Sequence, residues 1–132
     1  MFATAGYAAA KARYSTIDIA SKVEGATPHQ LIAVLYEELI KSLDTLVVGL
    51  SANGTLTRAG AIQRKARANA ILFGLEGCLD HEQGGELARG LSAIYREARR
   101  LLEQGVGEHD PKPVIQTREM ISEIASAWAR IG

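Results

Sequence analysis

The sequence predicts an all-α fold, an antiparallel up-down-up-down four-helix bundle with a mobile N-terminal arm. Four segments repeat apolar residues at the spacing of an amphipathic helix. The connections between them are only about 4–7 residues long, which makes consecutive helices antiparallel neighbours. All three prolines stand near expected helix starts and leave the long segments free to be helical. We therefore assign residues 1–26 to the arm and residues 27–132 to the bundle.

The first helix is expected to begin after Thr27. The hydroxyl of Thr27 and the side chain of Gln30 can form a capping box, and Pro28 takes the first helical position, where its missing N–H costs nothing. Asn53 and Gly54 end the segment. Between these signals a row of leucines follows at helical spacing: Leu31, Leu35, Leu39, Leu43, Leu46 and Leu50.

The other three helices follow turn signals. The second is expected over residues 57–79, and the third over residues 85–104, after a turn at residues 83–85. The fourth begins where Asp110 can cap a helix that opens with Pro111. The apolar rows expected to face inward include Ile62 and Phe73, then Leu87, Leu91 and Ile94, then Ile115, Ile121, Ile124, Trp128 and Ile131.

Residues 1–26 differ from the rest of the chain. They are rich in alanine and carry scattered larger residues, Tyr7 and Tyr14 among them, without a continuous apolar stripe. We expect this arm to pack loosely on the bundle.

The composition excludes several classes of function. A single cysteine, Cys78, excludes a disulfide framework and a cysteine-rich zinc site, and it favours a reducing compartment, so we expect a cytoplasmic protein. The 15 basic and 15 acidic residues balance, which argues against nonspecific nucleic-acid binding. The longest charge-free run, residues 45–57, is too short to cross a bilayer, so no stable membrane insertion is expected. His29 and His81 are expected at one end of the bundle and His109 at the other, and we predict no metal and no cofactor.

Catalysis is not expected, because no motif brings a nucleophile and a base together. Basic residues do cluster, however: Arg58, Arg64, Lys65 and Arg67 on the second helix, and Arg96, Arg99 and Arg100 on the third. They form either solvated helix faces or a rim that pairs with acidic side chains of a partner. A small enzyme that binds an anionic substrate through Arg58, Arg64 and Arg67 is a third possibility, and it would require a buried cavity.

The first helix carries more apolar residues than a bundle helix needs. Ile32, Tyr36, Ile40 and Val47 form a second row beside the leucines, and an arc this wide exceeds what two neighbouring helices usually cover. The arm covers the excess, or a partner does, or this helix is simply the most central one. On the third helix Leu91 belongs to the inner row, and Tyr95 beside it lies either in the core or in a groove.

Four stretches together resemble the FliS family of flagellar secretion chaperones, over about residues 23–131. The first runs from Ala26 to Tyr36 and includes the capping box. The third, residues 79–88, reads LDHEQGGELA and leads into Leu91 and Tyr95. The second comprises Lys65, Ala66, Ala70, Ile71 and Leu75, and the fourth Ile121, Ile124, Ala127 and Trp128. The sequence departs from the family pattern at Glu37, where glycine is common, and at Glu97, where a second tyrosine often follows Tyr95.

The resemblance implies a chaperone without catalytic activity. Such a protein holds the disordered C-terminal segment of flagellin, prevents premature polymerisation and delivers the subunit to the flagellar type III export gate. In this family a tyrosine of the arm is implicated in capping the bundle or docking on the gate, and Tyr14 matches it best, with Tyr7 second. We expect a monomer or weak dimer. The alternative is a helical adaptor or regulator that binds a different protein client. The partner-binding residues predicted are Tyr7, Tyr14, Ile32, Tyr36, Ile40, Val47, Leu91 and Tyr95.

Overall fold

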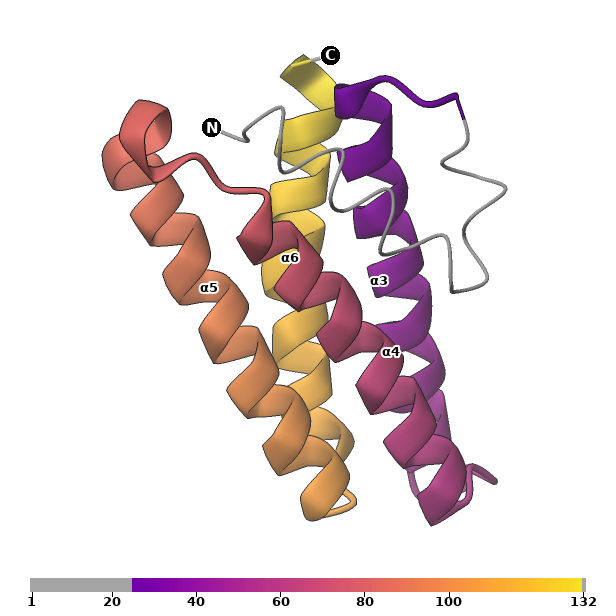
Figure 1. Cartoon of the computed structure of the whole chain (residues 1–132). Helices are drawn as coiled ribbons and strands as arrows, with labels where there is room; N and C mark the ends of the chain where they lie inside the picture. The colour runs from indigo at the N-terminus through magenta and orange to yellow at the C-terminus, as the bar shows by residue number, and fades with distance from the viewer. Residues whose placement is uncertain (1–24, 132) are drawn as a thin grey trace.

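The computed structural model describes residues 25–131, and this part of the chain forms an antiparallel four-helix bundle, as predicted (Figure 1). The helices are α3 (Pro28–Leu50), α4 (Arg58–Gly77), α5 (His81–Gly107) and α6 (Pro111–Ile131). Both α3 and α5 pack on α4 and on α6. Consequently α4 lies diagonally opposite α6. Most of the expected arm, including Tyr7 and Tyr14, lies outside the described residues.

Local side-chain chemistry starts α3, α4 and α6 as the sequence predicts. The Gln30 amide donates to Thr27 Oγ1 at 3.1 Å, and the Thr27 amide donates to Gln30 Oε1 at 2.9 Å, which completes the capping box. Thr57 caps α4 through the Gly60 amide at 3.0 Å. Asp110 accepts from the Lys112 amide at 3.0 Å where α6 begins.

Helix α5 is longer than expected at both ends. Asp80 caps a first turn that begins at His81, and Gly85 then breaks the helix with φ 49° and ψ −122°. A φ in this region suits glycine because it has no Cβ. At the other end the helix continues through Gly105, where a Cβ would approach Val114 Cγ2 to 2.8 Å. Gly105 therefore does not end α5. Its lack of a side chain lets the start of α6 pack closely against α5. Helix α4 is shorter than expected, since it ends at Gly77.

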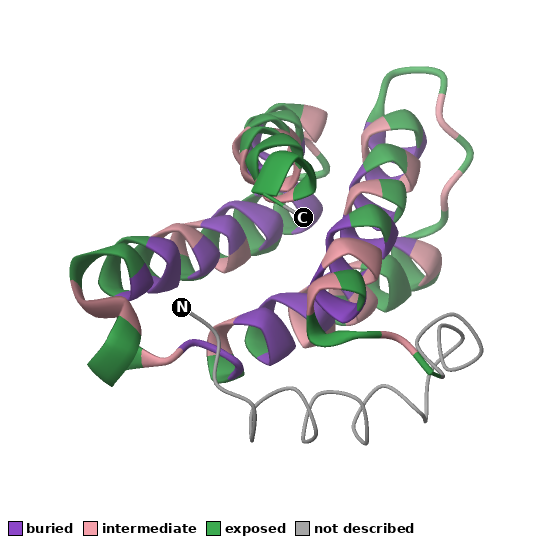
Figure 2. Ribbon diagram, turned by 90° about the horizontal axis from the view of Figure 1, so that it is seen from above, coloured by how far each residue is buried: buried purple, intermediate pink, exposed green. Residues whose placement is uncertain are grey.

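The core is centred on α3. Eleven of its 23 residues are buried, including the whole leucine row, whereas α6 buries only Pro113, Val114, Thr117 and Ile121. Figure 2 shows that the buried positions lie on the sides of the helices that face one another. The apolar excess of α3 is thus largely explained by its central place. No helix within residues 25–131 is both long and apolar enough to span a membrane.

Several apolar residues that were expected to face inward are exposed instead. They are Ile62, Phe73, Leu87, Ile115 and Ile131. The physical reason is that each helix packs on only two neighbours, so an apolar row on its outward side stays uncovered. Cys78 is buried.

Candidate functional site

A buried pair of tyrosines joins two diagonally opposite helices. The hydroxyls of Tyr36, on α3, and Tyr95, on α5, are 2.7 Å apart, and both side chains are almost completely buried. Burial, reinforced by the neighbouring Tyr36, raises the pKa of the Tyr95 hydroxyl far above its usual range. The Tyr95 hydroxyl thus stays neutral at ordinary pH.

The second half of α6 is held loosely over this pair. No residue of α6 after Ile121 is buried. Its main anchor is Trp128, whose Nε1 donates to the His29 carbonyl oxygen at 3.0 Å. The indole also stacks on the His29 ring, with ring centroids 4.5 Å apart. Trp128 was expected to be a core plug, but it is half-buried and fastens the end of α6 to the start of α3.

An apolar groove of about 240 Å³ lies between α5 and the end of α6. Leu87, which is 60% exposed, and Ile131, which is 69% exposed, line its mouth. Its other lining residues are Tyr36, Leu91, Ile124, Ala127 and Trp128. The groove carries apolar surface that a monomer leaves in contact with water.

A second groove of about 300 Å³ lies on the other side of α6, against α3. Ile40 and Ala125 give it an apolar wall, while Glu37 and Lys41, whose charged groups are 3.3 Å apart, border it. Tyr36 lines this groove as well as the first. The two grooves thus flank one loosely packed helix segment.

The structure gives the predicted partner-binding residues different surroundings. Tyr36 and Leu91 are buried but line a groove, and Ile40 is half-buried in the second groove. Ile32 and Tyr95 are completely buried in the core. Val47 is half-buried and packs against the core.

Sequence reasoning missed four residues of the groove between α5 and α6 as binding candidates: Leu87, Ile124, Ala127 and Ile131. Their apolar character was visible, and helical periodicity placed most of them inward. One sequence feature could have indicated the exposure of Leu87, namely the glycine pair just before it. The helix is broken at Gly85, and the turn that follows the break lies near the end of the bundle.

The two apolar grooves suit the binding of another chain. Among the described residues no group of three His, Cys, Asp or Glu side chains could hold a metal ion. Apolar grooves beside a helix are the geometry that accepts an amphipathic helix in protein complexes.

Comparison of the sequence with known proteins identifies the family to which this helical bundle belongs. The family model described as flagellar protein FliS matches residues 10–132. The chain is 31% identical to the flagellar secretion chaperone FliS of Salmonella typhimurium, in an alignment covering 89% of this chain and 86% of that protein. It is 28% identical to the Vibrio cholerae protein of the same name, covering 89% and 85% of the two chains. Pseudomonas aeruginosa FliSB is 27% identical, with 88% and 90% covered. The chain belongs to the FliS family.

Proposed function

We propose that this chain is a cytoplasmic export chaperone that binds the disordered C-terminal segment of flagellin, prevents its premature polymerisation and delivers it to the flagellar type III export apparatus. The family membership supports the chaperone class. The observation that carries the binding site is the pair of apolar grooves beside the loosely packed end of α6.

A disordered client suits these grooves for a physical reason. Folding on binding costs about 2–5 kcal/mol in ordering and is offset by burying roughly 1,000–3,000 Å². Two grooves on either side of one helix segment let an amphipathic client extend its contact around α6. The client's own assembly surface is then covered, and neither a nucleotide nor a metal is needed for release.

Leu87→Glu tests the site. Because Leu87 is 60% exposed in the free protein, the change should alter the free energy of unfolding by only about 0.5 kcal/mol. Complete burial of a leucine contributes about 1.5–3 kcal/mol, so covering this exposed share contributes about 1–2 kcal/mol. Affinity for a flagellin C-terminal peptide should fall about tenfold or more, measured by titration calorimetry.

Ile62→Glu is the matched control, since Ile62 is 45% exposed on α4, diagonally opposite α6. It should leave peptide affinity unchanged. Loss of affinity in both variants, or in neither, would contradict the assignment of the groove. Export should follow binding, so cells that carry Leu87→Glu should secrete less flagellin than cells that carry the unaltered chain.

The roles proposed for Tyr14 and Tyr7 at the export gate rest on the family resemblance alone, because both residues lie outside the described part of the chain. Truncation of residues 1–24 should leave the α5–α6 groove in place and weaken binding to the purified gate domain if that proposal holds.

A further inference from the structure

The outward side of α4 carries an apolar stripe that faces away from both grooves. Ile62, Ala66 and Phe73 are exposed and share one side of the helix, with Ile62 at 45% and Phe73 at 54% exposure. The two large side chains are roughly 16 Å apart along the axis, at 1.5 Å per residue. Exposed apolar residues at this spacing can anchor one partner helix.

Positive charge concentrates on the same helix, although the chain as a whole is neutral. Helix α4 carries four cationic residues, Arg58, Arg64, Lys65 and Arg67, against a single acidic one, Glu76. Lys65 pairs with Glu103 at 3.0 Å, and Arg67 with Glu38 at 3.5 Å. Arg58, at the first turn, makes no ion pair with any described residue.

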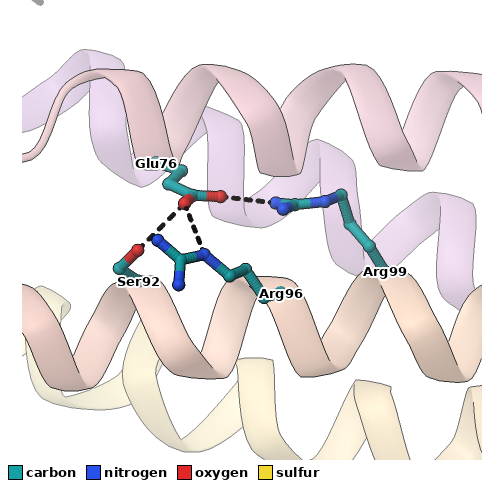
Figure 3. A network of polar contacts seen from close by, with 4 residues as sticks. All are labelled: Glu76, Ser92, Arg96 and Arg99. Atoms are coloured by element: carbon teal, nitrogen blue, oxygen red, sulfur yellow. Dashed lines mark hydrogen bonds and ion pairs between the residues drawn. The ribbon is translucent and has the colours of Figure 1, made fainter.

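Two arginines of α5, Arg96 and Arg99, contact Glu76 of α4 (Figure 3). Arg99 also lies over Phe73, so these arginines extend the charge to that end of the stripe. Arg99 Nη1 donates to Glu76 Oε1 at 2.6 Å, and Arg96 Nε donates to Glu76 Oε2 at 3.2 Å. The single carboxylate of Glu76 therefore pairs with two guanidinium groups, and the three side chains together carry one net positive charge. Ser92 also donates to Glu76, at 2.9 Å.

Arg96 and Arg99 lie where the acidic side chains of a ligand could bind while its apolar side chains contact Phe73. The Arg99 guanidinium lies 4.1 Å above the Phe73 ring, so charge and apolar surface meet at one point. Arg96 is 67% exposed, and it donates to Glu76 through Nε rather than through its terminal nitrogens. A terminal guanidinium edge is suited to a carboxylate. A shallow hollow of about 340 Å³ lies beside Phe73, and Glu76, His81 and Arg99 also line it.

From these observations we propose that the outward side of α4, with Arg96 and Arg99 of α5, is a second docking surface, and that its occupant is an acidic amphipathic helix of another protein. A second copy of this chain fits less well, because a symmetric contact would bring Arg58, Arg96 and Arg99 of one copy against the same cations of the other. The surface lies diagonally opposite α6, so this partner and a client in the α6 grooves bind together.

The test uses a synthetic helical peptide of about 18 residues with two leucines at the Ile62-to-Phe73 spacing, flanked by glutamates. The full chain is titrated with this peptide and with a counterpart in which every glutamate is lysine, by fluorescence anisotropy. Only the acidic peptide should bind, and its affinity should fall at high salt. Phe73→Ser should weaken binding about tenfold, as expected when about half of a phenylalanine loses its cover.

Arg58→Glu tests the charge without disturbing the fold, because a carboxylate at the start of a helix is favourable to the helix dipole. It should weaken binding several-fold, whereas Lys112→Glu, the same charge reversal at the start of the diagonal helix α6, should not. Leu87→Glu should leave this binding unchanged while it weakens binding of the flagellin peptide.

Three outcomes would overturn the proposal. One is equal binding of the acidic and lysine peptides, and another is acidic binding that survives Phe73→Ser. The third is a concentration-dependent dimer, seen by analytical ultracentrifugation, that Phe73→Ser dissolves, since this would assign the surface to a second copy of the chain. None of these outcomes bears on binding of flagellin at the α6 grooves.

Discussion

The hydrogen bond between Tyr36 and Tyr95 ties α3 to α5 across the centre of the bundle, and we expect a double-mutant cycle to expose its contribution. The two hydroxyl oxygens are 2.7 Å apart in a site where both residues are almost completely buried. The variants are Tyr36→Phe, Tyr95→Phe and the double variant. Each change removes one oxygen and keeps the ring, so packing is preserved.

The magnitude follows from what each change leaves behind. Tyr36→Phe deprives the buried Tyr95 hydroxyl of its partner, and an unpaired buried hydroxyl costs about 1–3 kcal/mol. Removing both hydroxyls leaves no orphaned group of this pair, so the double variant should be less destabilised than the sum of the single variants. We expect a coupling energy of about 1–2 kcal/mol.

The assay is unfolding in urea, monitored by circular dichroism. The free energies of unfolding of the variants are compared with a common dependence on urea concentration. The cycle would refute the reasoning if the losses of the single variants simply added up. Alkaline pH supplies a second readout. Because the pKa of Tyr95 is raised above its usual 10.0, the folded state favours the neutral hydroxyl, and the stability that this contributes below pH 10 is lost as the pH rises further. Tyr95→Phe should make the stability less sensitive to pH in that range.

Two further predictions concern the interfaces of α5. Burial disfavours the charged form of Glu76, but the hydrogen bonds from Arg99 and Ser92 and the charge of Arg99 outweigh the effect of burial and lower the pKa of Glu76 below 4.5. Because the folded state favours the ionised carboxylate, the free energy of unfolding should fall as the pH drops below about 4.5. Glu76→Gln should flatten this acid dependence in pH-dependent urea titrations, and an unchanged profile would show that Glu76 is not responsible. Gly105→Ala should destabilise the bundle by about 1–3 kcal/mol because the new Cβ would lie 2.8 Å from Val114 Cγ2. Gly90→Ala, with open space at the Cβ position, should stabilise it by about 0.5–1 kcal/mol, and thermal melts that rank the two variants the other way would contradict this reading of α5.

The local signals in the sequence were sufficient for the starts of α3, α4 and α6, whereas the cap at Asp80 that starts α5 was missed. The capping box at Thr27 and Gln30 and the cap at Asp110 form as predicted, because their hydrogen bonds join residues that are at most three positions apart. The end of α5 was misplaced because Gly105 serves a contact with Val114 on the next helix, which no local rule reveals.

The candidate site was less accessible to sequence reasoning. Periodicity identifies an apolar row but does not say whether another helix covers it. It placed Leu87 in the inward row and left Tyr95 open between core and groove, whereas the structure leaves Leu87 exposed at a groove and buries Tyr95 completely. Likewise Ile32, in the apolar excess of α3, was predicted to bind a partner, but it is enclosed by the core.

The sequence by itself determined the helical class, the order of the helices and the family, because these depend on periodicity, capping residues and short connections that act within one or two turns. Only the tertiary structure decided which apolar residues remain uncovered. In a ring of four helices each helix has two neighbours, and the positions of those neighbours, set by packing between distant segments, determine that Leu87, Ile131 and Phe73 face solvent while Tyr36 and Tyr95 meet at the centre.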